Sequence, residues 1–385
     1  MNRGDKKKHA NIENTIIGIL FIVFLSTSFV FTTINSKESY KKAKKAGGVI
    51  EAWNMDYDID SNLKVNVFVK QEYLNLQGYI SKSINQRELN DVIKLNNGYL
   101  TSVQQRATDE ALLSNVKVLA NIQEYLESKG IKFIYVRAPY KISVFDSQLT
   151  DGVIDYSADN SKRFVELLDQ YNINYIDIGS QMHNDGLNQY DYYYKTDHHW
   201  TPEGGLYAFS KIDDEIKKEL GITDENKYTD IESYNIKVYK NWHLGSSGQR
   251  VGVYYAGADD MHYIKPIEDV IITDVTTQET DSFSKIMYDE SVLCKRDYKQ
   301  RLTYDTLYGA AMGHQLHNDS AANNIKVLVS SDSMGKVVVP YMVLSYEDVY
   351  WTCISKELID EYKPDVVVMI KYQDSETVSD SIDFY

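Results

Sequence analysis

The sequence predicts an α/β protein in which helices flank a parallel sheet. Two observations carry this prediction: helical patterns alternate with short strand-like runs over 108–221, and the same alternation returns over 326–370. Strands that alternate with helices pair in parallel, because each helix carries the chain back to the end of the sheet where the strand began. The hydrophobic content of 43% is that of a globular chain.

The first stretch contains the better-defined helix boundaries. Apolar residues at helical spacing run from Leu112 to Leu126, and a strand-like run follows. Thr201 is a good N-cap, a proline follows it at the first helical position, and Gly221 suits the C-terminal end of that helix. The predicted elements are a helix over 108–126, a strand at 131–136, a helix at 161–171, a strand at 174–178 and a helix over 202–221.

The second stretch repeats the scheme, and the segment between the two does not. The predicted elements are a strand at 326–330, a serine turn, a helix at 336–345, a strand at 348–354, a helix at 355–362 and a strand at 365–370. Residues 222–320 instead combine Tyr, Gly and short alternating runs. We expect this segment to be an elaborated, partly β insertion.

The N-terminal region predicts a membrane anchor. Residues 16–34 are uncharged and apolar, which is long enough to cross ~30 Å of hydrocarbon as a helix. Basic residues precede the stretch and no small-x-small cleavage site clearly follows, which favours an uncleaved signal-anchor. We therefore expect a short cytoplasmic tail (1–15), a single-pass helix in the cell membrane (16–34), a stalk or lead-in (35–95) and an extracytoplasmic catalytic domain (96–385).

The charge distribution argues against nucleic acid as a partner. Residues 1–46 carry nine Lys and Arg against three Asp and Glu, so with a net charge of −15 overall the remainder stands near −21. A surface this acidic repels phosphate backbones.

Cys294 and Cys353 are the only cysteines, too few for a disulfide framework. They can pair or stay free, and the apolar run around Cys353 predicts a buried free thiol.

Three titratable residues stand directly ahead of the helix at 202–221. Asp197 and His199 are separated by one residue, so both side chains can point to one side of an extended turn while His198 faces elsewhere. Ser333 lies at a strand-to-helix turn, and a serine nucleophile needs an adjacent base that a third group orients. The residues predict a triad of Ser333, His199 and Asp197. The backbone N–H of Ser333 would be one oxyanion donor.

Each part of this triad has another interpretation. Ser331, Asp332 or Ser333 could each simply cap the following helix. The Asp-His-His sequence could belong to a metal cluster, for which His314 and His317 would be further ligands. No ligand pair at recognisable spacing supports that cluster, so no metal and no cofactor is predicted. Trp200 is more typical of a core residue than of a substrate platform.

Residues 196–201, Thr-Asp-His-His-Trp-Thr, resemble the signature of the DHHW protein family, which is similar to the alginate O-acetyltransferase-type branch of the SGNH hydrolase-like proteins. The resemblance covers about 95–375 and includes segments 97–100, 137–141, 245–252, 259–260 and 331–333. It implies an SGNH hydrolase-like fold with a permuted strand order. It also implies an exported or membrane-anchored O-acyltransferase whose serine passes an acyl group, usually acetyl, to a surface polysaccharide hydroxyl.

In this resemblance Asp197, His199 and Ser333 match the family's acid, base and nucleophile. The partners it implies are the polysaccharide acceptor and a membrane-bound O-acyltransferase that supplies the acyl group. Further candidates for oxyanion or substrate binding are Ser331, Asp332, His198, Trp200 and Lys141. The chain departs from the family at Ser331, where glycine is expected, and at 308–312, which lacks the expected asparagine; the second oxyanion donor is therefore unassigned.

Two other functions stay open at the level of sequence. A glycan-binding or scaffold protein of a polysaccharide-modifying assembly would keep the fold without efficient chemistry, and the altered turn residues favour it. An acetyl esterase would use the same triad with water as the acceptor.

Overall fold

An eight-stranded sheet organises the protein, in the order β5-β4-β13-β11-β12-β10-β8-β9. Its strands are β4 (Lys132–Ala138), β5 (Tyr175–Asp177), β8 (Ile271–Asp274), β9 (Glu279–Ser282), β10 (Gln315–His317), β11 (Lys326–Ser331), β12 (Asp348–Trp351) and β13 (Val366–Tyr372). The five strands from β5 to β12 are parallel. The other three, β10, β8 and β9, continue the sheet antiparallel. The prediction of a parallel sheet is therefore correct for the five strands and wrong for the edge, which makes the sheet mixed.

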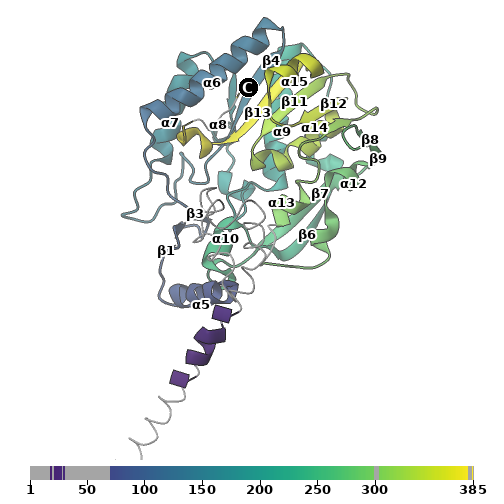
Figure 1. Ribbon diagram of the computed structural model, residues 1–385. Coiled ribbons are helices and arrows are strands. Elements are labelled where there is room, and N and C mark those ends of the chain that lie inside the picture. The colour runs from purple at the N-terminus through teal and green to yellow at the C-terminus, as the bar shows by residue number, and fades with distance from the viewer. Residues whose placement is uncertain are drawn as a thin grey trace, which may run out of the picture. The chain divides into compact units, whose positions relative to one another are not determined.

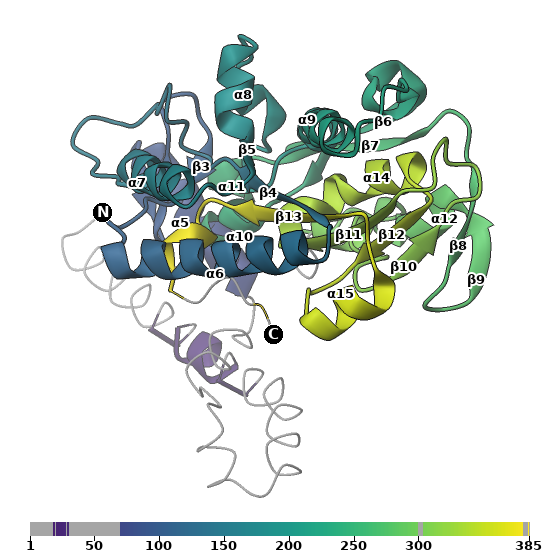
Figure 2. The same ribbon diagram turned by 90° about the horizontal axis from the view of Figure 1, so that it is seen from above.

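Helices cover both faces of this sheet, as Figure 2 shows from above. The main ones are α6 (Asp109–Ser128), α7 (Ser157–Gln170), α9 (Pro202–Leu220), α14 (Val339–Ser345) and α15 (Lys356–Tyr362). Side chains of a strand alternate between the faces. In β4, Phe133 and Tyr135 pack with α6, α7 and α15, whereas Ile134 and Val136 pack with α9 and α14. Two apolar cores result, one on each face.

Most of the predicted helices and strands are confirmed, although some begin or end elsewhere. Thr201 caps α9 by accepting a hydrogen bond from the Gly204 N–H, and Gly221 ends this helix in the left-handed region at φ 69°. The helix expected from 336 begins only at Val339, because a 3-10 turn, η5 (Ser333–Val337), comes first. The strand expected to reach 354 ends at Trp351.

The region between the two α/β stretches is partly β, as expected. Strands β6 (Tyr234–His243) and β7 (Asp259–Pro266) form a separate antiparallel pair, while β8, β9 and β10 join the central sheet. The helices here are α10 (Ser246–Val251), α11 (Val253–Ala256), α12 (Phe283–Met287) and α13 (Thr303–Leu307), with 3-10 turns η2 (Lys227–Thr229), η3 (Ile231–Ser233) and η4 (Glu290–Leu293). Strands β8 and β9 have four residues each and β10 has three, too few for a clear periodic signal.

The remaining elements lie before α6, between β5 and α9, and after β13. They are α5 (Lys70–Ser83), β1 (Glu88–Leu89), β2 (Val92–Lys94), β3 (Leu100–Thr101), α8 (Ile178–Asn184), η1 (Gln189–Tyr192) and η6 (Ser375–Thr377). Strands β1, β2 and β3 form a small antiparallel sheet of their own.

Cys294 and Cys353 are both free and exposed. The prediction of a buried thiol at 353 is wrong, because β12 ends two residues earlier.

This computed structural model describes residues 18–19, 21–27, 29–30, 70–298, 303–379 and 384. Residues 78–385 form one compact unit, drawn in Figure 1, and the chain divides from it at residue 77. Among the described residues, no helix is both long and apolar enough to cross a membrane. Much of the anchor predicted at 16–34 and most of the stalk at 35–95 lie outside the described residues. The anchor and the domain boundaries stay predictions.

Candidate active site

The serine turn follows directly from β11, at the carboxyl end of a central parallel strand, where open α/β sheets bind ligands. Ser333 is the first residue of η5 and Asp332 is its N-cap. The Asp332 carboxylate accepts the Met334 N–H (2.9 Å) with one oxygen and the Tyr372 N–H (2.6 Å) with the other. Both oxygens are thus used to hold the turn against β13. Asp332, expected as an oxyanion or substrate contact, is a turn-holding residue instead.

The structure brings Ser333, His199 and Asp197 together. The Nε2 of His199 lies 2.7 Å from the Ser333 hydroxyl, and its Nδ1 lies 3.2 Å from Oδ1 of Asp197. Asp197 is fully buried and His199 is 2% exposed, whereas Ser333 is half-buried and can be reached. A ring whose Nδ1–H donates to a carboxylate presents a lone pair at Nε2, which is the form that accepts a hydroxyl proton.

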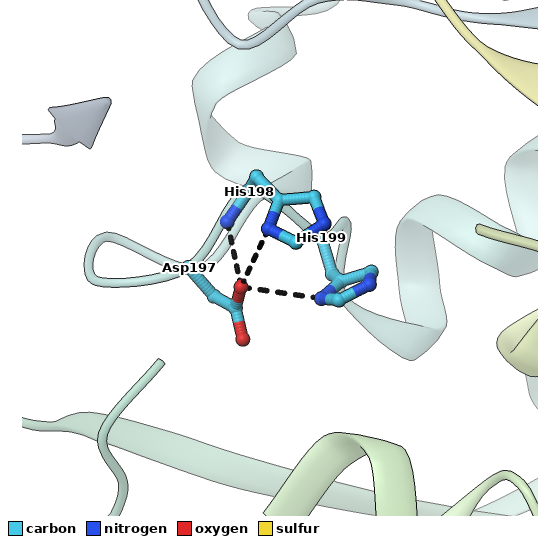
Figure 3. Close-up of side chains that lie close together, drawn as sticks. All are labelled: Asp197, His198 and His199. Carbon is cyan, nitrogen blue, oxygen red and sulfur yellow. Dashed lines mark hydrogen bonds and ion pairs between the residues drawn. The ribbon is translucent and has the colours of Figure 1, made fainter. Parts of the chain in front are cut away.

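His198 does not face away from Asp197, as the sequence led us to expect. Figure 3 shows both histidine rings turned toward the same carboxylate oxygen. The Nδ1 of His198 lies 3.1 Å from Oδ1 of Asp197 and 3.0 Å from the Ser246 hydroxyl, and its ring centroid lies 3.9 Å from that of His199. The side chain is 37% exposed. Of the substrate-binding candidates, His198 is therefore one that a bound molecule can reach.

The Asp197 carboxylate is the centre of a hydrogen-bond network. Oδ1 also accepts the His198 N–H (2.8 Å) and the Ser246 hydroxyl (2.9 Å), while Oδ2 lies 2.9 Å from Nε2 of His243. Burial by itself raises the pKa of this carboxyl, but attraction to His199 and the hydrogen bonds from the three histidines hold its pKa well below the ordinary value. Asp197 is therefore ionised in this site at neutral pH.

The His199 ring is held in place by an aromatic neighbour as well as by Asp197. The ring of Tyr304, in α13, stacks on it with centroids 4.1 Å apart, and the Tyr304 hydroxyl donates to the backbone carbonyl of Ser333 (3.1 Å). Burial lowers the pKa of His199, and the charge of Asp197 opposes that shift without cancelling it. The imidazole is therefore neutral at physiological pH and ready to act as a base.

Lys141 and Trp200, two further candidates for substrate contact, are fully buried and hold the turns instead. The Lys141 ammonium donates to the backbone carbonyls of Leu100 (2.7 Å), Lys195 (2.9 Å) and Asp197. Burial lowers the pKa of Lys141 to about 7, against the attraction of two nearby carboxylates. The Trp200 indole N–H donates to the Met334 carbonyl (2.9 Å), which ties the histidine turn to the serine turn.

Ser331 is also occupied within the fold. Its hydroxyl accepts the Trp351 indole N–H (2.8 Å) and packs so closely on Gly335 that a Cβ there would lie 2.1 Å from it. Because this hydroxyl accepts rather than donates in that bond, its expected contribution to an oxyanion site stays a prediction. The Ser333 N–H has no acceptor among the described residues, which leaves it available as an oxyanion donor. A second donor is not assigned.

The metal interpretation has limited support. Among the described residues, the group that could hold an ion is Asp197 with His198 and His199. However, His199 Nε2 is directed at Ser333, and Oδ2 of Asp197 is bound to His243. His314 and His317 do not join this group, because they bind Asp274, Asp348 and Asp319 in the distant edge of the sheet. The donor set fits a hydrogen-bonded triad better than a closed metal site.

Three residues of the site were missed by reasoning from the sequence: His243, Ser246 and Tyr304. All three come from 222–320; Ser246 lies within the segment 245–252 of the family resemblance, but no role was assigned to it. The one available signal was the glycine-rich segment at 245–252. A Cβ at Gly245 would lie 2.3 Å from Cβ of Asp197, so only glycine lets this segment approach the carboxylate so closely.

Residues 99–236 match the family model of ALGX, the SGNH hydrolase-like domain of the acetyltransferase AlgX. The resemblance to the DHHW and AlgX-type SGNH hydrolase-like proteins is confirmed. The matched range contains Lys141, the histidine turn and α9, but not Ser333. No curated protein matches the sequence significantly.

Solved structures of this type share the fold. Bacillus cereus PatB1 superposes with a TM-score of 0.63 at 18% identity, over 76% of this chain and 99% of that one. A DHHW family protein from Eubacterium siraeum superposes with a TM-score of 0.55 at 15% identity, over 76% and 94%. The fold shared with these two structures therefore spans about three quarters of this chain, whereas the family model matches 99–236. At these identities the likeness shows the fold alone. The activity has to be argued from the geometry of the site.

Proposed function

We propose that the protein is an SGNH-like O-acyltransferase, most simply an O-acetyltransferase, that modifies an extracytoplasmic polysaccharide through Ser333, His199 and Asp197. The observation that carries this proposal is the 2.7 Å hydrogen bond between His199 Nε2 and the Ser333 hydroxyl. The family match supports acetyl transfer, because its description names an acetyltransferase. The same bond argues against a scaffold without chemistry.

The reaction has two steps that use the same residues. In the first, His199 takes the Ser333 proton as Oγ attacks the acyl carbonyl, and it then returns that proton to the leaving group of the donor as the acyl–serine ester forms. In the second, His199 takes the proton of a glycan hydroxyl, whose oxygen attacks the ester, and the proton passes to Ser333 Oγ as it leaves. Asp197 stabilises the imidazolium in both steps, and the Ser333 N–H faces the developing oxyanion.

The location and the partners belong to the same proposal. Residues 16–34 serve as a single-pass anchor in the cell membrane, with residues 1–15 in the cytoplasm and the catalytic domain outside. This topology separates the domain from cytoplasmic acyl donors, so a membrane-bound O-acyltransferase supplies the acyl group. The acidic chain favours a neutral or weakly charged polysaccharide over a polyanion as acceptor.

Intact-mass spectrometry after exposure to a chromogenic acetyl ester tests the proposal. The native protein should gain one acetyl group and release the chromophore, whereas Ser333→Ala and His199→Ala should do neither. Ser331→Ala is the matched control, because it removes a hydroxyl from the same turn and should still acquire the adduct. A folded native protein with neither adduct nor turnover would contradict the proposal and favour the glycan-binding scaffold.

The acceptor distinguishes a transferase from an esterase. An oligosaccharide added to the ester assay should be acetylated at the expense of free acetate if the glycan hydroxyl competes with water. Acetate release at an unchanged rate, with no acetylated sugar detected by mass spectrometry for any acceptor in a panel, would identify the protein as an acetyl esterase.

A further inference from the structure

A cavity of about 190 Å³ opens at the carboxyl edge of the sheet, beyond β4 and β5. Its lining includes Pro139, Tyr140, Phe145, Ser180, Gln189 and Gln373. These residues take no part in the chemistry proposed for Ser333. The cavity is small and polar as well as apolar, which suits one unit of a larger ligand better than a whole drug-sized molecule.

Two buried glutamines give this cavity a specific chemistry. Gln373 accepts the Tyr140 N–H with Oε1 (3.1 Å), and Gln189 donates to the Tyr140 carbonyl with Nε2 (2.7 Å). Both side chains are 6% exposed. Because the backbone of Tyr140 fixes which end of each amide faces it, the other ends are fixed too. Gln373 presents its NH₂ group and Gln189 its carbonyl oxygen.

Neither of these amide ends has a hydrogen-bond partner among the described residues. An unpaired donor and an unpaired acceptor that line one cavity match a hydroxyl group, which both donates and accepts a hydrogen bond. Both atoms are accessible to solvent rather than sealed from it, so a polar occupant of the cavity can replace water as their partner. The Ser180 side chain offers a further hydroxyl in the same lining.

An apolar surface adjoins the amide pair. Phe145 is 49% exposed, and its ring stacks on His183 with centroids 3.8 Å apart and planes within 2°. Pro139 forms another wall of the cavity. An exposed ring beside hydroxyl-binding groups is the combination that a pyranose requires, because a sugar ring has apolar C–H faces and hydroxyl edges.

The cavity and the nucleophile lie on the same edge of the sheet. Gln373 follows β13, and its neighbour Tyr372 donates to Asp332, which caps the serine turn. Gln189 belongs to η1, just before the histidine turn. Since β4, β13 and β11 are adjacent strands, the cavity is roughly 10 Å from the serine turn along the edge. A short run of sugar units spans that distance.

We propose that this cavity is a remote subsite that binds one neutral sugar unit of the acceptor chain while another unit of the same chain presents its hydroxyl to Ser333. The inference rests on the proposed function for the role of the occupant. The sugar should be neutral, because the cavity lining contains two carboxylates, those of Glu166 and Asp177, and one ammonium, that of Lys162.

Binding is tested without catalysis, in full-length Ser333→Ala protein titrated calorimetrically with chitopentaose and cellopentaose. At least one pentasaccharide should bind saturably and its monosaccharide at least tenfold more weakly. Ser180→Trp, which fills the cavity, and Phe145→Ala, which removes the exposed ring, should each weaken binding at least tenfold. Ile154→Ala is the matched control, because it removes another exposed apolar side chain, 72% exposed, outside the cavity lining. Thermal unfolding confirms that each variant is folded.

The subsite is wrong if neither pentasaccharide binds, or if Ser180→Trp and Phe145→Ala bind as tightly as Ile154→Ala. Ester turnover by the native protein, measured separately, keeps this result distinct from the proposed function. Turnover with no effect of the cavity variants would overturn the subsite alone. Cavity-dependent binding with no turnover would overturn the acyltransferase and leave a glycan-binding site.

Discussion

His243 Nε2 lies 2.9 Å from Oδ2 of Asp197, on the opposite side of the carboxylate from the oxygen that orients His199. His243 is fully buried, at the end of β6, and its Nδ1 has no partner among the described residues. Its hydrogen bond to Asp197 is therefore the polar contact that can account for its position. The carboxylate is fixed from both sides, which restricts it to one orientation toward the His199 imidazole.

Replacement of His243 should thus reduce catalysis without touching the nucleophile. His243→Phe keeps a ring but removes the donor, and a hydrogen bond to a charged group contributes about 1.5–3 kcal/mol, so kcat/KM for the ester should fall roughly 10–100-fold. His243→Gln retains a donor of similar reach and should recover most of that loss. Equal activity in Phe and Gln variants that unfold at the native temperature would rule out this positioning role.

The pH dependence of turnover should report the burial of His199. Burial lowers the pKa of His199 below its usual 6.5. Because the base must be neutral, kcat/KM should rise with pH, with the midpoint of this rising limb below pH 6.5, and then level off. Asp197 raises the His199 pKa; Asp197→Asn should therefore shift the limb to lower pH while reducing the plateau by roughly 10⁴-fold, as in other triads.

Rate measurements over pH 4–8 with the chromogenic ester check this expectation. The control is Asp191→Asn, which replaces an exposed acidic residue of η1 just before the histidine turn and should leave the pH profile where the native one is. A native limb centred above 6.5, or one that moves upward in Asp197→Asn, would show that another group is the titrating base.

Lys141 should contribute to stability through its three carbonyl partners. Lys141→Met keeps the length of the side chain but leaves the Leu100, Lys195 and Asp197 carbonyls without their donor, at about 1–3 kcal/mol for each buried group that stays unsatisfied. We expect a loss of roughly 3 kcal/mol or more in urea unfolding. Lys195→Met is the control. Lys195 is an exposed lysine of the histidine turn, and its replacement should change the free energy of unfolding little.

The sign of the pH effect on stability separates Lys141 from an ordinary lysine. Burial lowers the native pKa of Lys141 to about 7, while in the unfolded chain it stays near the usual value of about 10.4. Between these values the unfolded chain binds more protons, so this group makes the free energy of unfolding rise with pH across the window. Lys141→Met should flatten that slope; identical slopes in the variant and the native protein would contradict the assignment.

The parts of the structure that the sequence predicted are those with local signals. Thr201, its following proline and Gly221 define α9 because caps act within one turn of helix. The triad of Ser333, His199 and Asp197 was inferred from the base and the orienting acid that a serine nucleophile needs, and from the family resemblance. By contrast, the roles of His243 and Tyr304 depend on contacts between distant segments, and neither residue stands in a local pattern.

Lys141 shows why the default expectation for a residue type can fail. A lysine is normally exposed, and nothing in its own segment reveals that Leu100 and the histidine turn direct three carbonyls at it. The antiparallel edge of the sheet was missed for a related reason: β10 has three residues and β8 four, too few for alternation to be distinguished from a loop.

Trp200 offers the sharpest test of how the histidine turn and the serine turn are joined. Its indole N–H binds the Met334 carbonyl, one residue after Ser333, so Trp200→Phe leaves that buried carbonyl unpaired and the smaller ring leaves a void. Destabilisation of about 2–4 kcal/mol should follow. Because the lost bond connects the base-bearing turn to the nucleophile, kcat should fall more than the change in KM for the ester explains. Trp351→Phe is the control: Trp351 is also a buried tryptophan, but it lies in β12 and its N–H binds Ser331, so it does not connect the histidine turn to the serine turn. If both variants lose equal stability and only Trp200→Phe loses kcat, the bond aligns catalysis; if both lose kcat alike, its role is packing alone.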